Sequence, residues 1–189
     1  MKAFIREIAI TVILALGIFL LLRFTIDTVI VIGVSMEPSF HNGQRVLVSK
    51  VSYRLHDPDR GDVIVFQPAN EPEGDFIKRI IGIPGDTVEV ENGAVYINGE
   101  KLMEPYIKNA PRYSLNETEI PAGNYFVLGD NRNNSNDSHN GWVVPRENIV
   151  GKAWVSIWPP REWGTAPNYP LSQQLAEFIE AYVAATSLS

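Results

Sequence analysis

Cysteine is absent from this chain of 189 residues, and histidine occurs only three times. The missing cysteine excludes disulfide bonds and cysteine-rich metal sites, but it is compatible with either side of a membrane. Positive charge is also scarce, because 16 lysine and arginine residues stand against 22 aspartate and glutamate residues, giving a formal net charge of −6. This deficit of basic residues argues against a nucleic-acid partner.

The length of the chain predicts one domain with an appendage, or two small domains. The apolar content of 45% is sufficient for a core, and 13 prolines with 14 glycines indicate many turns. Frequent turns are typical of a β-rich fold.

The longest apolar run lies near the N-terminus, where residues 8–22 carry no charge between Arg6 and Arg23. A cleaved signal peptide would need small residues at its end, but this run ends in three leucines. A buried core helix fits a run somewhat shorter than the ~20 residues that a membrane span requires. We favour a retained membrane anchor over residues 1–27, in which residues 3–5 extend the span and the flanking arginines reach the interfaces.

The charges around this run bear on its orientation. Lys2 and Arg6 favour a cytoplasmic N-terminus, with the rest of the chain on the other side of the membrane. Arg23, at the far end of the run, weakens that preference.

Residues 28–160 are predicted to form an antiparallel β domain without a long helix. Short segments rich in β-branched and aromatic residues alternate with turns, and Asn92-Gly93 between two of them is a strong hairpin signal. Polar loops are expected at residues 70–75 and 109–119. The expected strands are residues 29–32, 46–51, 63–66, 77–83, 87–90, 94–97, 125–128 and 153–158.

Residues 161–189 are predicted to form a linker followed by an amphipathic helix over residues 171–188. Because the polar face of this helix lacks lysine and arginine, we favour packing on the body, or fraying, over contact with a membrane. Its apolar side chains recur at spacings of three and four: Leu175, Phe178, Ile179 and Tyr182.

Ser35 has neighbours that suit a special role. Gly33 allows close approach of another backbone, Pro38 fixes the chain after the serine, and Met36 is an apolar side chain available to a membrane or a substrate. A lone serine is more often an ordinary surface residue. The G-x-S-x-G nucleophile elbow is not met, because Glu37 stands at the position of the second glycine.

Lys78 lies within an otherwise apolar predicted strand. Side-chain alternation places Lys78 and Arg79 on opposite faces, so one of the two is expected to face inward or into a cleft. The alternative is an edge strand with outward charges. An inward lysine is desolvated, its pKa falls, and it can serve as a base for a serine without any histidine.

The polar stretch at residues 129–138 supplies a third set of candidates. It has the composition of a solvated loop, and it fails as an EF-hand because Arg132 occupies a ligand position and the required glycine is missing. Alternatively, Asp130, Arg132 and Asp137 form a buried network that holds the geometry of another site. The adjacent His139 permits a Ser-His-Asp triad, which we rank below the Ser–Lys pair.

Four segments in order, after the apolar run, resemble the sequence boxes of the type I signal peptidases. Each box alone is moderate support, whereas four in order, covering the chain to about Trp158, are very specific. They are S-M-x-P-T at residues 35–39, with serine as the last residue, R-G-D-[IV]-[IV]-[VI]-F at 60–66, K-R-[IV]-[IV]-G-x-P-G-D at 78–86 and G-D-N-R-x-N-S-x-D-S at 129–138.

This resemblance implies a membrane-bound serine endopeptidase that removes signal peptides after small residues at −1 and −3. Ser35 would be the nucleophile and Lys78 the general base. Ser135 corresponds to the family's serine that hydrogen-bonds the lysine amine. Three further residues correspond to positions that shape the site from behind: Asp130, Arg132 and Asp137.

The expected partners are signal peptides of secreted preproteins and the lipid bilayer, with no cofactor, no metal and no nucleic acid. We expect Met36, Pro38 and Ile77 to contact the substrate. The resemblance does not fix the depth of the pockets that would receive the small residues.

Two positions depart from the family pattern. Gly33 stands where some members carry a serine that contributes to the oxyanion hole, so the hole is expected to depend mainly on the Ser35 backbone N–H. His139 stands where many bacterial members have arginine. In this respect residues 137–140 are similar to the cyanobacterial and thylakoid branch.

Two other functions remain open at this stage. A self-cleaving Ser/Lys regulator would need an N-terminal DNA-binding domain, where this chain has its apolar run. A membrane-tethered β module that binds peptides without cleaving them would use the polar stretch as its recognition surface.

Overall fold

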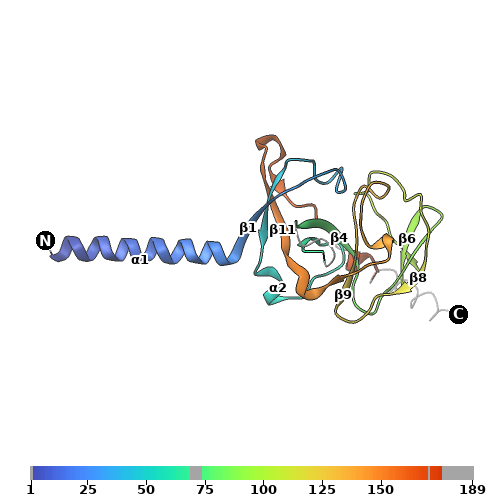
Figure 1. Cartoon of the computed structure of the whole chain (residues 1–189), viewed down its shortest axis with the longest axis horizontal. Coiled ribbons are helices and arrows are strands. Elements are labelled where there is room, and N and C mark those ends of the chain that lie inside the picture. Colours follow the sequence, from blue (N-terminus) through green and yellow to red (C-terminus); the bar gives the residue numbers. More distant parts are fainter. Residues whose placement is uncertain (1, 69–73, 170, 176–189) are drawn as a thin grey trace, which may run out of the picture.

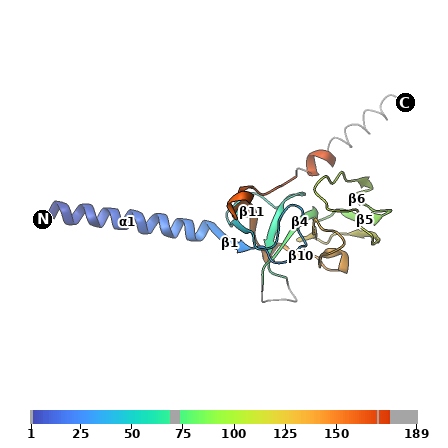
Figure 2. The ribbon, with the colours of Figure 1, turned by 90° about the horizontal axis from the view of Figure 1, so that it is seen from above.

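The computed structural model describes residues 2–68, 74–169 and 171–175. One long helix, α1 (Lys2–Thr25), projects from a β body, and Figures 1 and 2 show it pointing away from the body in both views. Within the body, two antiparallel sheets are joined, and the smaller one lies at the end farthest from α1. The predicted class, a mainly antiparallel β protein with an N-terminal apolar helix, is confirmed.

The larger sheet has the strand order β1-β2-β11-β3-β4-β9-β10, with β12 paired to β11. Strand β4 is therefore an interior strand, flanked by β3 and β9. The bounds are β1 (Ile26–Ile30), β2 (Arg45–Ser49), β3 (Val63–Phe66), β4 (Phe76–Gly82), β9 (Asn124–Leu128), β10 (Val144–Pro145), β11 (Ile149–Trp158) and β12 (Gly164–Thr165).

The smaller sheet has the order β7-β6-β5-β8. Its strands are β5 (Thr87–Glu91), β6 (Ala94–Ile97), β7 (Glu100–Lys101) and β8 (Leu115–Glu119). The β5–β6 hairpin turns at Asn92 and Gly93, whose φ angles of 51° and 76° are those that an Asn-Gly turn provides. Short helical turns complete the body: α2 (Ser52–Leu55), η1 (Ser138–Asn140), η2 (Arg146–Asn148) and η3 (Pro160–Glu162).

Several expected element boundaries are wrong. The strand expected at residues 153–158 is β11, which begins four residues earlier, at Ile149. Residues 115–119 were expected to be loop, but they form β8, which pairs with β5 at the edge of the smaller sheet. An edge strand with exposed polar side chains shows no apolar alternation to reveal it. The first strand begins at Ile26 rather than at residue 29, because Ile26 to Ile30 pair continuously with β2.

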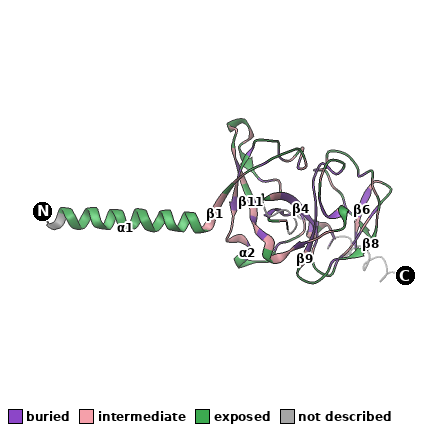
Figure 3. Cartoon of the chain, in the orientation of Figure 1, coloured by how far each residue is buried: buried purple, intermediate pink, exposed green. Residues whose placement is uncertain are grey.

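Helix α1 is exposed along its described length (Figure 3), and none of the segment Phe4–Thr25 is buried against the body. This exposure excludes the core-helix interpretation. The helix is long and apolar enough to cross a membrane, a test that a signal sequence also passes.

The C-terminal segment packs on the body where it is described. Residues 171–175 are helical, and Leu171 and Leu175 are buried in a cluster with Val88, Ile97 and Leu128. Packing on the body is therefore the arrangement seen for this part. The remaining residues of the expected helix, with Phe178, Ile179 and Tyr182, lie outside the described residues.

Candidate active site

Ser35 lies in the loop between β1 and β2, which we call the nucleophile loop (residues 31–44). Gly33 makes the turn into the serine with φ of +87°, a value that favours glycine. Two apolar side chains anchor the loop, since Met36 and Phe40 are each 1% exposed and pack in one core cluster. Met36 is thus a core residue, and the expectation that its side chain contacts a membrane or a substrate is corrected.

Lys78 contacts Ser35, although the two residues are 43 positions apart in the sequence. The Lys78 Nζ lies 2.8 Å from the Ser35 Oγ and 2.9 Å from the Ile77 carbonyl oxygen. Only 4% of Lys78 is exposed, and the Phe76 ring centroid lies 5.3 Å from its Nζ. The structure therefore brings the sequence-predicted pair into contact inside the protein.

Burial lowers the pKa of Lys78 to about 8, against the opposing effect of the negative charges of Asp137 and Asp130. An amine with such a pKa is uncharged in roughly one molecule in ten at pH 7. The neutral amine can accept the hydroxyl proton of Ser35, which lies within hydrogen-bond distance.

Arg79 is also buried, on the opposite face of β4 from Lys78. Its guanidinium is fully buried and makes a two-fold ion pair with Asp130, at 2.9 Å and 2.7 Å. The Tyr106 ring lies 4.2 Å from the Arg79 guanidinium carbon. Because β4 is an interior strand with both faces covered, both charges point inward, rather than the single one expected. Asp130 also accepts the Ser39 hydroxyl at 2.5 Å, which ties the nucleophile loop to this pair.

The polar stretch 129–138 is a buried network rather than a solvated loop. Arg132 is 1% exposed and makes two 2.7 Å bonds to Glu104. Asp137 is fully buried, accepts the Gly129 N–H at 2.9 Å and lies 2.6 Å from the His139 Nδ1. The sequence gives no sign of Glu104 as the partner of Arg132.

Ser135 differs from expectation. Its Oγ is buried without a hydrogen-bond partner among the described residues, so the expected bond to Lys78 is not formed. The amine instead contacts Ser35 and the Ile77 carbonyl. Ser135 packs against Gly129, where an added Cβ would lie 2.3 Å from the Ser135 Oγ and 2.5 Å from the Ser35 carbonyl oxygen. Gly129 therefore allows the two loops to approach.

Asn131 is a positioning residue that the sequence did not single out. Its backbone N–H donates to the Ser35 carbonyl at 2.9 Å, and its Nδ2 donates to the Val34 carbonyl at 3.1 Å. The asparagine is 8% exposed. These two bonds fix the peptide units on either side of the nucleophile.

Of two backbone N–H groups near the Ser35 hydroxyl, one is hydrogen-bonded and the other is not. The Gly33 N–H donates to the Asn42 Oδ1 at 2.9 Å. The Ser35 N–H makes no hydrogen bond to any of the described residues. It is thus available to an oxyanion, as the substitution of glycine at position 33 led us to expect.

The histidines do not assemble a triad with Ser35. His139 pairs with Asp137, His41 pairs with Glu162 at 3.1 Å, and the His56 Nδ1 faces the Asp57 carbonyl. None of the three, all of which are described, bonds to the serine. Within residues 2–68, 74–169 and 171–175, no group of three or more acidic or histidine side chains could hold a metal ion.

Comparison with known proteins identifies the family of this chain. Residues 2–158 match the signal peptidase family, peptidase S26. The chain is 44% identical over 174 residues to the probable signal peptidase I-1 of Synechocystis sp., covering 88% of this chain and 89% of that protein. It is 43% identical over 175 residues to signal peptidase I of Leptolyngbya laminosa, covering 87% of this chain and 85% of that protein.

A crystal structure of a signal peptidase I from Enterococcus faecalis V583 matches with a TM-score of 0.47 and 32% identity, over 51% of this chain and 97% of that one. The family match and the cyanobacterial relatives define the class of protein: the chain belongs to the signal peptidase family, peptidase S26. It is an enzyme of the signal peptidase I type.

Proposed function

We propose that Ser35 and Lys78 form the catalytic dyad of a membrane-anchored endopeptidase that cleaves signal peptides from exported proteins after small residues at −1 and −3. The observation that carries this proposal is the 2.8 Å separation of the Ser35 Oγ from the Lys78 Nζ. Burial of the amine, which lowers its pKa to about 8, supports its role as base.

In the proposed reaction, neutral Lys78 takes the hydroxyl proton as Ser35 attacks the scissile carbonyl carbon. The Ser35 N–H donates to the oxyanion, a type of contact worth roughly 3 kcal/mol. Lysine then gives the proton to the leaving amine, which completes the acyl-enzyme. A water molecule, deprotonated by the same lysine, attacks the ester and releases the signal peptide with a free carboxylate.

An extended substrate has a place to bind beside β4. Strand β9 pairs with β4 only from Arg79 onward, whereas β3 pairs with residues 76–79 of β4. Residues 76–78 thus keep one edge without a strand partner among the described residues, next to the dyad. A peptide added at this edge would satisfy these backbone groups. The exposed Pro38 remains a proposed substrate contact. Ile77, which precedes Lys78 in β4 and is 8% exposed, is proposed to contact the substrate through its backbone.

Helix α1, which is long and apolar enough to cross a membrane, supports a membrane-anchored arrangement. We assign residues 1–27 as the anchor, 28–160 as the catalytic domain and 161–189 as the linker with the C-terminal helix. We propose a cytoplasmic N-terminus with the catalytic domain on the opposite side of the membrane, an orientation that Lys2 and Arg6 favour.

Covalent labelling tests the dyad. An acylating serine-protease inhibitor should label Ser35 in the full chain, and a peptide with alanine at −1 and −3 should be cleaved. Ser35→Ala should lose both, and Lys78→Met should lower both at least a hundredfold, because general-base catalysis contributes on that order. Ser114→Ala and Lys101→Ala, at exposed positions, serve as matched controls.

The possible results separate the alternatives. Equal labelling of the wild-type chain and Lys78→Met would contradict the role of the lysine. Peptide binding without labelling or cleavage would favour a binding module. Cleavage of the chain itself, with no peptide turnover, would favour a self-cleaving regulator.

A further inference from the structure

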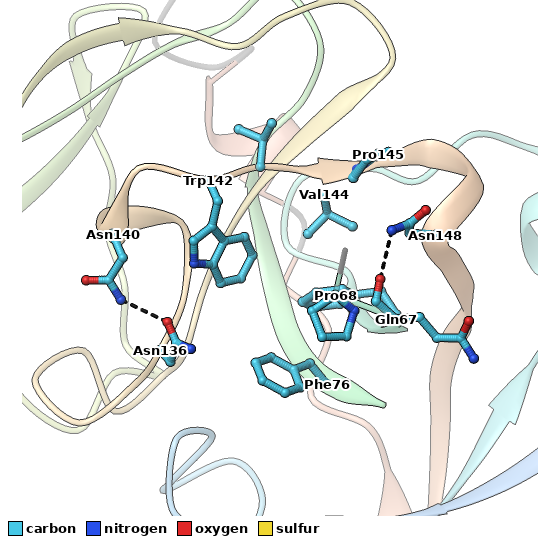
Figure 4. A pocket seen from close by; sticks show the side chains of 11 residues that line it. Gln67, Pro68, Phe76, Asn136, Asn140, Trp142, Val144, Pro145 and Asn148 are labelled. Carbon is cyan, nitrogen blue, oxygen red and sulfur yellow. Dashed lines mark hydrogen bonds between the residues drawn. The ribbon is translucent and has the colours of Figure 1, made fainter. Parts of the chain in front are cut away.

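A pocket of about 280 Å³ lies beside the dyad, on the face of β4 that carries Lys78. Figure 4 shows the Trp142 ring, the Phe76 ring and the Val144 side chain around the pocket. The buried Phe66 also lines the pocket, and its ring lies 6.0 Å from that of Phe76 and 6.2 Å from that of Trp142. The walls are therefore mostly aromatic.

The rim of this pocket is made of amides. The Asn140 Nδ2 donates to the Asn136 Oδ1 at 3.0 Å, and on the other side the Asn148 Nδ2 donates to the Gln67 carbonyl at 2.9 Å (Figure 4). No charged side chain is among the described residues that line it. Apolar walls with a neutral polar rim suit an uncharged apolar side chain whose backbone meets hydrogen-bonding groups at the entrance.

The pocket and the dyad share one neighbouring residue, Phe76. Phe76, which forms one wall, also contacts the Lys78 amine, with its ring centroid 5.3 Å from the Nζ. Asn136, on the rim, lies between Ser135 and Asp137 in the sequence, and Asp137 belongs to the buried network. A peptide strand added along residues 76–78 would thus pass the mouth of the pocket.

We infer that this pocket is a specificity subsite for one aromatic or large aliphatic side chain of the preprotein, at a position other than −1 and −3. The inference rests on the proposed function. An alanine methyl group would leave most of the 280 Å³ empty and forfeit the contacts that the rings offer. The pocket is therefore too large to be the one that selects small residues.

A peptide series tests the subsite with the full chain in detergent micelles. Each peptide keeps alanine at −1 and −3 and carries Phe, Ala or Lys in turn at every other position from −5 to +3. At one position, the Phe peptide should exceed the Ala peptide roughly tenfold or more in kcat/KM, as apolar pockets discriminate. Trp142→Ala should reduce this ratio to about one. Trp154→Ala, an exposed tryptophan on β11, should leave it unchanged.

A second variant covers the case in which Trp142→Ala does not fold. Asn140→Asp adds a carboxylate at the exposed rim and should favour the Lys peptide at the same position two- to fivefold over the wild-type value, as for an exposed ion pair.

Two negative results are distinguishable. If the wild-type enzyme cleaves every peptide with no preference at any position, the subsite inference is overturned and the proposed function stands. That result would be expected of a pocket that holds a lipid chain. The subsite inference is also overturned if the preference survives both substitutions. A wild-type enzyme that cleaves no peptide would overturn the proposed function and the subsite with it.

Discussion

At the level of single side chains, two opposing effects set the pKa of Lys78. Burial removes water from its amine, while Asp137 and Asp130 attract the proton. Asp130 is paired with Arg79, which offsets part of its charge. With a folded-state pKa of about 8 against an ordinary 10.5, protonation of Lys78 opposes folding below pH 8 by about 3 kcal/mol. This cost fades as pH rises from 8 to 10.5.

The pH dependence of cleavage should report this side chain. Because only the neutral amine accepts the serine proton, kcat/KM should rise with pH and reach half its plateau near pH 8. Asp137→Asn removes the negative charge that most favours the protonated form, so the midpoint should move to lower pH. The measurement is peptide cleavage between pH 6 and 10. A midpoint near the ordinary lysine value, or one that Asp137→Asn moves upward, would count against Lys78 as the base.

At the level of elements, the site depends on how the nucleophile loop is held against residues 129–131. The Ser39 hydroxyl reaches Asp130, Gly129 permits contact with the Ser35 carbonyl, and Asn131 bonds the loop backbone twice. Each of these contacts joins segments that are more than 90 residues apart, so none is visible in local sequence.

Asn131→Ala tests the side-chain contact between Asn131 and the nucleophile loop. It leaves the Val34 carbonyl without its 3.1 Å donor, while the backbone bond to Ser35 remains. A serine held less firmly should lower kcat about tenfold with little change in KM, because misplacement of the nucleophile costs rate rather than binding. Kinetics with the alanine-containing peptide measure the split. Asn134→Ala, at an exposed asparagine three residues on, is the matched control. An equal loss in both variants would contradict the positioning role of Asn131.

The sequence predicted some elements to the residue and missed others for physical reasons. Strand 63–66 matches β3, because its apolar run is bounded by a Gly-Asp turn, and the Asn92-Gly93 hairpin follows from the φ angles that those residues allow. Strand β8 was missed because its exposed side chains carry no burial pattern. The start of β1 was missed because pairing with β2, rather than local composition, decides where α1 ends.

From the sequence, the site could be predicted only where the type of a residue indicates its chemical role. Ser35 and Lys78 were predicted as a pair, and the structure brings them together. The partner of Arg132 was not predicted, because Glu104 becomes its neighbour only when the chain folds. The Ser135 hydroxyl was assigned a partner that the structure does not give it.

At the level of the whole molecule, helix α1 and the body share few contacts. Helix α1 buries none of the segment Phe4–Thr25, and its junction is held by the Lys50 N–H, which donates to the Thr25 carbonyl at 2.9 Å, and by the Lys50–Asp27 ion pair at 2.7 Å. The opposite end is different, since Leu171 and Leu175 are part of a core cluster.

Removal of residues 2–24 should therefore leave a folded catalytic body. This deletion keeps Thr25 and Asp27, so both junction contacts survive, and Tm should stay within a few degrees of the full-length value because no buried surface is lost. The shortened chain should still cleave the alanine-containing peptide in solution, but it should no longer sediment with lipid vesicles.

The full-length protein, recovered from membranes, should retain its N-terminal residues when its mass is measured. A recovered mass that lacks the first 25 or so residues would show that the apolar run is a cleaved signal rather than an anchor. Loss of folding on deletion would show that α1 supports the body in a way that its exposure does not reveal.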